Sequence, residues 1–234
     1  MNASRIHGVV RIAIAVWCAT LALANRVSAQ GAVAGTVAIV ERGSKSSKDL
    51  AEAVVYLMAD RVTARAGSAI DNAVVNMTGR EFVPHVQIVR AGGSVAYPNK
   101  DPFSHNVFSN TALGAFDLGL YRSGASRAAV FARPGVYAIY CNIHARMVNF
   151  VLAVNTPYVA RVNKHGAFQL SGVPAGTYRL HVWHERAAES VQTVSVLPNG
   201  LVGLKVTLDA RSYAPVPHPD KFGKPYASTR ADRY

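Results

Sequence analysis

Short β-type runs, broken at close intervals by turn residues, constrain this chain more than any other feature of its sequence. The breaks are made by Gly, Pro, Asn and Asp, as at Ala91-Gly92-Gly93, Pro98-Asn99-Lys100-Asp101 and Arg133-Pro134-Gly135. Short strands with this punctuation are typical of β-sandwiches and not of alternating strand–helix units. The sequence therefore predicts an all-β protein.

The expected strands cover most of the chain after its first thirty residues. They are Val33–Val40, Ala53–Met58, Asn72–Met77, His85–Val89, Gly93–Pro98, Ala128–Ala132, Gly135–Cys141, Asn149–Val154, Val159–Val162, Ala167–Leu170, Thr177–Trp183, Ser190–Val196 and Gly203–Leu208. A chain of 234 residues is long enough for one or two sandwiches with ordinary cores. Residues 210–234 are rich in Pro and charge and lack an apolar period, which predicts a disordered tail.

The N-terminus has the pattern of an export signal. Arg5 and Arg11 form a basic head, Ile12–Ala24 is apolar, and Val27-Ser28-Ala29 offers small residues at a cleavage site. The apolar run is too short to span a bilayer comfortably, so a retained anchor is the weaker alternative. We therefore expect a signal peptide over residues 1–29, a periplasmic or secreted mature chain, and no membrane span after cleavage.

Charge and cysteine content narrow the chemistry of the mature chain. The formal charge of the full chain is +12, and the chain stays basic after the signal leaves. This basic character suits acidic protein partners or anionic membrane surfaces, although a generally solvated basic surface is the preferred explanation. The sequence carries no nucleic-acid motif. Cleavage also removes Cys18, which leaves Cys141 unpaired in an oxidising compartment unless it is buried, bridged between chains or bound to a metal.

The surroundings of Cys141 favour a metal. The segment from Cys141 to Met147 has the spacing Cys-x2-His-x2-Met directly after a predicted strand, and His105 stands upstream. One thiolate, two imidazoles and one thioether are the ligand set of a blue-copper site, in which the thiolate favours Cu(I) and the thioether binds weakly. The alternative is that Cys, His and Met are ordinary core or surface residues. We expect copper bound by His105, Cys141, His144 and Met147.

The same region resembles the cupredoxins, with a metal loop as short as that of amicyanin, and it is similar to methylamine-utilisation-like proteins. The residues that carry this resemblance are Phe82-Val83-Pro84-His85, Gly93-Ser94-Val95, Asn99-Lys100-Asp101, His105-Asn106-Val107, Pro134-Gly135-Val136-Tyr137 and the metal loop. The resemblance implies a cupredoxin Greek-key β-sandwich over residues 72–155.

In that resemblance, His105 and His144 match the two histidine ligands, and His144 matches the surface ligand through which electrons leave. Cys141 matches the thiolate and Met147 the axial ligand. Asn106 matches a residue that ties the two ligand loops together. Arg146 departs from the apolar rim of typical members, which leaves the identity of the partner open.

A second small β-sandwich is expected over residues 156–209. Gly166-Ala167-Phe168 leads through Pro174-Ala175-Gly176 into a strand that carries Tyr178, which resembles carboxypeptidase-regulatory-like and transthyretin-like sandwiches. The first strands of such a fold have counterparts in residues 31–60. We therefore expect a discontinuous sandwich, 31–60 with 156–209, into which the copper domain is inserted; the alternative is that 31–60 adds strands to the copper domain.

These features together predict an electron carrier and not an enzyme. The chain shows no second cluster of His and Cys, no Gly-x-Ser-x-Gly and no nucleotide-binding loop. The leading function is single-electron transfer between periplasmic redox partners of unknown identity. The alternatives are copper storage or delivery, and a binding module with structural copper. His85, His181 and His184 are either structural histidines or part of a second metal site.

Overall fold

A computed structural model of the protein describes residues 30–43, 47–59 and 70–226. These residues form an all-β structure, as predicted, with one short 3-10 helix at Leu50–Glu52. No helix in the described part of the chain is long and apolar enough to cross a membrane. The predicted signal segment, residues 1–29, lies outside the described residues.

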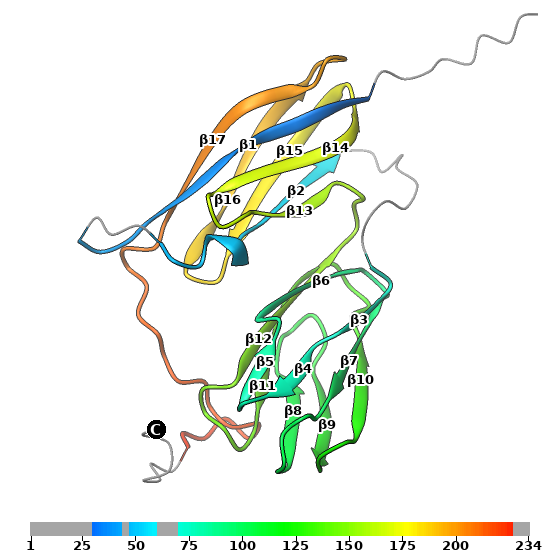
Figure 1. Cartoon of the computed structure of the whole chain (residues 1–234), viewed down its shortest axis with the longest axis vertical. Helices are drawn as coiled ribbons and strands as arrows, with labels where there is room; N and C mark the ends of the chain where they lie inside the picture. The colour runs from blue at the N-terminus through cyan, green and yellow to red at the C-terminus, as the bar shows by residue number, and fades with distance from the viewer. Residues whose placement is uncertain (1–29, 44–46, 60–69, 227–234) are drawn as a thin grey trace, which may run out of the picture.

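The lower part of Figure 1 is a cupredoxin-like β-sandwich. Its larger sheet has the strand order β6–β12–β11–β8–β9, with β6 (Val86–Arg90), β12 (Val148–Val154), β11 (Gly135–Cys141), β8 (His105–Ser109) and β9 (Phe116–Tyr121). The facing strands are β10 (Ser126–Val130), β7 (Ser94–Pro98) and β3 (Asn72–Val74), with the pair β4 (Asn76–Thr78) and β5 (Glu81–Val83). Both layers contribute to one core, which includes Tyr97, Tyr137 and Ile139.

The upper part of Figure 1 is a second sandwich of two sheets. One sheet has the order β14 (Ala167–Pro174), β1 (Gln30–Val40), β17 (Leu201–Asp209). The other has the order β13 (Val159–Arg161), β2 (Val54–Ala59), β15 (Gly176–His184), β16 (Ala187–Val196). Their inner faces share a separate apolar core that includes Val33, Leu57 and Leu180.

The chain passes from the upper sandwich to the lower one and back again. Strand β1 pairs antiparallel with β14 and parallel with β17, and β2 pairs antiparallel with β13 and β15. The strands from β3 to β12 pair only among themselves in the described residues. This pairing favours the insertion over the alternative in which residues 31–60 extend the copper domain. The division into separately folding domains stays a prediction.

Two strands next to the metal loop were not expected from the sequence. All five residues of β8 are buried, so this strand has no alternation of apolar and polar side chains to mark it. Strand β9 contains Asp117 and Gly119, which are unfavourable in strand interiors. Pairing with β11 and β9 holds β8 in place from both sides, which outweighs these weak local preferences.

The two sandwiches meet through an apolar interface of their own. Val54 and Trp183 of the upper sandwich pack against Val86, Leu152 and Val154 of the lower one. The guanidinium of Arg161 donates a hydrogen bond to the carbonyl oxygen of Val86 across the same interface. Burial of apolar side chains from both sides stabilises the observed arrangement of the two sandwiches.

An ion pair at this interface makes the stability of the contact between the two sandwiches depend on pH. Nε2 of His85, in the lower sandwich, lies 3.1 Å from Oε2 of Glu185, in the upper one. The Glu185 carboxylate raises the pKa of His85, against the lowering effect of burial. Because the pKa is raised in the folded state, the stabilisation is complete below the unfolded value of about 6.5 and is lost as pH rises through the folded value.

We therefore expect Glu185→Gln to lower the free energy of unfolding by up to about 1 kcal/mol near pH ~6 and by less near pH ~8. Urea unfolding of both proteins across this range measures the difference. His85→Gln should remove the same pH dependence. A loss in Glu185→Gln that is equal at both pH values would show that protonation of His85 does not control the contact.

The C-terminal segment differs from its prediction. A disordered tail was expected over 210–234, but residues 210–226 run down to the lower sandwich and contact the end that carries the metal loop (Figure 1). His218 is buried there, and the Tyr226 hydroxyl donates a hydrogen bond to the carbonyl oxygen of Cys141. Composition alone misled the prediction, because a few aromatic and charged side chains anchor a segment that has no regular structure of its own. Residues 227–234 lie outside the described part.

Candidate metal centre

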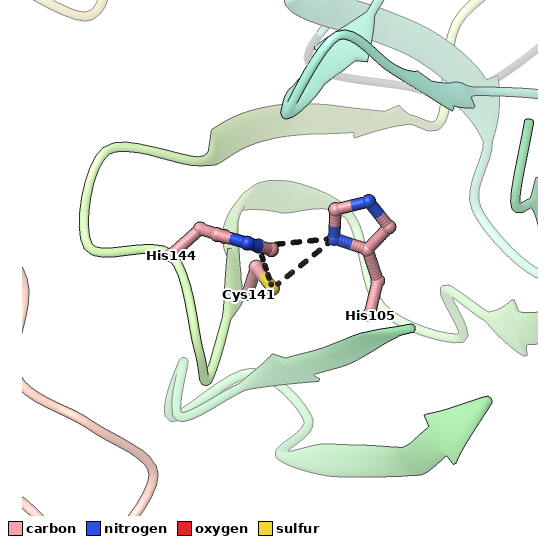
Figure 2. A group of neighbouring side chains, drawn as sticks. All are labelled: His105, Cys141 and His144. Atoms are coloured by element: carbon pink, nitrogen blue, oxygen red, sulfur yellow. Dashed lines mark hydrogen bonds between the residues drawn. The ribbon is translucent and has the colours of Figure 1, made fainter. Parts of the chain in front are cut away.

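Three side chains of the lower sandwich converge at one of its ends. His105 begins strand β8, Cys141 ends strand β11, and His144 lies in the loop between β11 and β12. In Figure 2 the two imidazole rings and the sulfur atom point toward one another. His105 and Cys141 are fully buried and His144 is half-buried. Strands β8 and β11 are hydrogen-bonded neighbours, which brings together residues that lie far apart in the sequence.

The ligand-type atoms of these residues are spaced as around a common centre. Sγ of Cys141 lies 3.6 Å from Nδ1 of His105 and 3.5 Å from Nδ1 of His144, and the two Nδ1 atoms are 3.2 Å apart. Ligands about 2.0–2.3 Å from one ion in a planar trigonal arrangement would be roughly 3.5–3.9 Å apart. The observed spacing is close to that range. Among the described residues, this is the one group of three His, Cys, Asp or Glu side chains that could hold a metal ion.

A buried carboxylate determines which nitrogen of His105 faces the site. Nε2 of His105 lies 2.8 Å from Oδ2 of Asp101. An ionised carboxylate only accepts hydrogen bonds, so the imidazole proton lies on Nε2 and leaves a lone pair on Nδ1, directed at the cluster. Burial raises the pKa of Asp101, but hydrogen bonds from the backbone N–H of Arg80, from His105 and from the backbone N–H of Gly79 outweigh it and lower the pKa. A carboxylate that orients a ligating histidine is a common feature of metal sites.

The protonation state of the Cys141 thiol depends on whether a metal ion is present. Burial raises the pKa of this thiol, while the backbone N–H groups of Ile143, Asn106 and His144 act in the opposite direction by hydrogen bonding to sulfur. Without a positive charge nearby, burial wins and the thiol keeps its proton. A metal ion would displace that proton, because only the thiolate is a ligand.

The loop that carries His144 closes tightly before β12. The backbone N–H of Met147 donates to the carbonyl of His144 at 3.0 Å, and the N–H of Cys141 donates to the carbonyl of Met147 at 3.2 Å. The Met147 side chain is only 1% exposed and belongs to the same core as Cys141. Its position in this loop is compatible with the predicted axial role, which stays a prediction.

The donor set suits copper in both of its common oxidation states. A thiolate with two imidazoles in a trigonal arrangement is the strong-ligand set of blue-copper sites, with a weak axial thioether as the usual fourth ligand. Nδ1 of His105 already offers its lone pair to the site, and the Cys141 thiol would become the third strong donor, beside Nδ1 of His144, once a metal ion displaces its proton. The residues present therefore fit a copper ion.

The rim of the site combines aromatic, apolar and basic groups. The Phe103 ring lies against both histidine rings, with centroids 5.3 Å from His105 and 5.6 Å from His144. The Arg80 guanidinium stacks over Phe103 at 5.3 Å. Ile143 and Arg146 are exposed beside His144. The half-buried His144 ring is therefore surrounded by apolar side chains, Phe103 and Ile143, with the positive charges of Arg80 and Arg146 further out.

The structure also bears on the predicted role of Asn106 and on the two interpretations of His181 and His184. The Asn106 side chain donates to Oδ1 of Asp117 on β9, at 2.7 Å, and not to the metal loop; only its backbone N–H reaches Cys141. His181 stacks on Tyr56, and His184 is fully buried 3.6 Å from Asp49. In the described residues neither belongs to a second group of metal ligands, so the structural interpretation of these histidines is favoured.

Asp101 and the C-terminal segment are the contributors that the sequence analysis missed. Asp101 stands four residues before His105, a spacing that could have suggested a partner for the ring, but it was noted only as part of the family resemblance. Tyr226 and His218 gave no signal, because nothing in a Pro-rich terminal segment indicates which surface it will contact.

Comparison with known proteins gives one family model and several similar solved structures. A family model for domain II of polysaccharide lyase family 4 matches residues 145–201. No curated protein matches the chain. Among solved structures, the chain is similar to amicyanin from Paracoccus versutus, with 20% identity over 42% of this chain and 98% of that chain and a TM-score of 0.34. It is also similar to a purple cupredoxin from Nitrosopumilus maritimus, with 20% identity over 51% and 99% and a TM-score of 0.30.

The Cu-containing nitrite reductase from Thermus scotoductus is a further similar structure, with 24% identity and a TM-score of 0.34. The match covers 41% of this chain and only 25% of that chain. The fold and the side-chain cluster together define an all-β protein with a cupredoxin-like β-sandwich and a two-histidine, one-cysteine centre. The carboxypeptidase-regulatory-like or transthyretin-like character of the upper sandwich stays a prediction.

Proposed function

We propose that this protein is an exported type 1 copper protein that carries single electrons between redox partners and catalyses no reaction of its own. The observation that carries the proposal is the convergence of His105 Nδ1, His144 Nδ1 and Cys141 Sγ at one end of the sandwich. A bound copper ion would supply the Cu(II)/Cu(I) couple. Met147 is proposed as its weak axial ligand.

The protein's own residues supply the conditions for rapid electron exchange. Asp101 holds the proton of His105 on Nε2, and the backbone N–H groups around Cys141 donate hydrogen bonds to its sulfur, which partly offset the effect of burial on the thiol. Cys141 and His105 are fully buried, so water is kept from two of the three donors. A rigid, dry donor set changes little between oxidation states, which favours electron transfer over ligand exchange.

The charges at the rim support a proposal about the kind of partner. His144 is the half-buried ligand, and Arg80 and Arg146 place positive charge around it. A redox protein with acidic side chains around the exposed edge of its own redox centre would be complementary in charge to this surface. The proposed location is the periplasm or the exterior of the cell, in keeping with the signal peptide expected over residues 1–29.

Titration of the metal-free protein with Cu(II) tests the proposal. We expect an intense thiolate-to-copper absorption band near ~600 nm and a reversible one-electron wave in voltammetry. Zn(II) is the control, because it fits nitrogen and sulfur donors but has no redox chemistry and should give neither signal. Tight Cu binding without the band and without a reversible wave would contradict electron transfer and favour copper storage or delivery.

A further inference from the structure

The segment 216–226 contacts the two strands that carry the metal ligands. It has left the upper sandwich after β17 and lies on the outer face of the lower sheet, beside β11, β8 and β9. The cupredoxin-like sandwich is complete in its strands without this segment. Its contacts with the metal end therefore need an explanation of their own.

One contact is made to the backbone of the cysteine itself. The Tyr226 hydroxyl donates a hydrogen bond of 2.8 Å to the carbonyl oxygen of Cys141, and the backbone N–H of Lys221 donates one of 2.8 Å to Oδ1 of Asn142. Cys141 and Asn142 open the loop whose backbone N–H groups at Ile143 and His144 reach the sulfur. The segment thus holds the first peptide of the metal loop.

A second contact reaches the strand that carries His105. Nζ of Lys221 lies 2.6 Å from Oδ2 of Asp117, and Oδ1 of the same carboxylate accepts the hydrogen bond from Asn106. Asn106 follows His105 directly in β8. Burial raises the pKa of Asp117, but the hydrogen bonds from Lys221 and Asn106 outweigh it and lower the pKa, so this carboxylate is a charged bridge between the segment and β8.

An aromatic contact joins the two attachments. The His218 ring stacks on Tyr140 with centroids 4.1 Å apart, and its other neighbours are Phe108, at 6.2 Å, and Tyr226, at 5.3 Å. Tyr140 and Phe108 are paired across β11 and β8, one residue before Cys141 and three residues after His105. Phe108 is only 1% exposed although it belongs to the outer face, and His218 lies beside it.

We propose that residues 216–226 form a C-terminal clamp that positions the metal centre by tying β11 and β8 together from outside the sandwich. The proposal rests on the proposed copper function, which it deepens. Tyr226 and Lys221 are its positioning residues: they touch no ligand side chain and act through the Cys141–Asn142 peptide and the Asp117–Asn106 pair. Loss of the clamp would loosen the geometry of Cys141 without removing a donor.

Labelling of Cys141 in the metal-free protein tests the clamp independently of copper. A buried thiol reacts with iodoacetamide only when the structure opens locally, so the labelling rate reports how firmly the loop is held. A chain ending at Pro215 should label at least about tenfold faster than the full chain, since three hydrogen bonds of ordinary net strength are lost. A chain ending at Tyr226 is the matched control and should label at the full-chain rate. Mass spectrometry of the Cys141 peptide separates this signal from Cys18.

Two point variants keep the test decisive if the shortened chain does not fold. Tyr226→Phe removes one hydrogen bond and Lys221→Met removes one ion pair, and neither side chain is part of a core. The double variant should label about tenfold faster, with a melting temperature close to that of the full chain. Addition of a synthetic peptide of residues 216–226 to the shortened chain should slow the labelling again.

A readout with copper distinguishes positioning from general stabilisation. In the Cu(II)-loaded protein, loss of the clamp should shift the wavelength of the thiolate absorption band. It should also speed copper removal by a chelator about tenfold, because the same contacts are lost. Labelling and copper removal at the full-chain rate in the double variant would overturn the clamp. A full chain that never shows the thiolate band would instead overturn the proposed function, while the labelling result with metal-free protein would stand.

Discussion

Replacement of Cys141 by Ser is expected to abolish the intense absorption band near ~600 nm, because the band arises from charge transfer between thiolate sulfur and Cu(II) and a hydroxyl oxygen cannot supply it. The side chains are nearly equal in size and Cys141 is fully buried, so the fold should survive the exchange. The absorption spectrum of the Cu(II)-treated variant, together with its copper content, measures the effect.

Cys18→Ser is the matched control for this result. Cys18 is the other cysteine of the chain, and it lies in the segment predicted to be removed as a signal. We expect the spectrum of Cys18→Ser to equal that of the unaltered protein. A band that persists in Cys141→Ser would show that the absorbing ligand is not this thiolate, and the proposed centre would be wrong.

The second large effect is expected at Met147. A thioether binds Cu(II) weakly, so its loss should leave copper bound while changing the balance between the oxidation states. Met147→Leu should raise the reduction potential, because the loss of a donor destabilises Cu(II) more than Cu(I). Met147→Gln should lower it, because an amide oxygen favours Cu(II). On the one-electron scale of 59 mV per tenfold change in relative affinity, shifts on the order of 100 mV correspond to roughly 2 kcal/mol.

Met77→Leu is the control for the methionine variants. Met77 is fully buried in the same core as Met147, and its sulfur contacts the hydroxyl of Tyr121 at 3.9 Å, but it is not part of the Cys-x2-His-x2-Met sequence. Voltammetry of Met77→Leu should give the potential of the unaltered protein. If both Met147 variants also kept that potential, Met147 would not be a ligand, and its place in the Cys-x2-His-x2-Met spacing would be coincidence.

The cluster of candidate metal ligands was easiest to anticipate from the sequence where the donors are local. Cys141 and His144 are three residues apart, at the point where a recognisable strand ends, so their proximity follows from the chain itself. His105 required knowledge of which strand lies beside β11, and the family resemblance supplied it. Asp101 was noted without a role, because the direction of a ring nitrogen depends on which side chains surround it in the folded protein.

The strands, like the metal ligands, were predictable where a local sequence pattern marks them. Strands with one buried face, such as β14, carry an alternating pattern that is visible in the sequence. Strand β8 is buried on both faces and carries no such pattern. The sequence favoured an inserted copper sandwich, and the pairing of β1 with β17 joins segments that no local preference connects.

The sequence by itself determined the all-β class, the positions of most strands and the residue types of the candidate metal ligands, because these depend on residue type and short spacing. Only the tertiary structure decided that Asp101 orients His105, that His85 and Glu185 join the two sandwiches, and that residues 216–226 lie against Cys141. Each of these contacts joins residues whose individual preferences are weak. Their free energy appears only when packing has already brought the partners together.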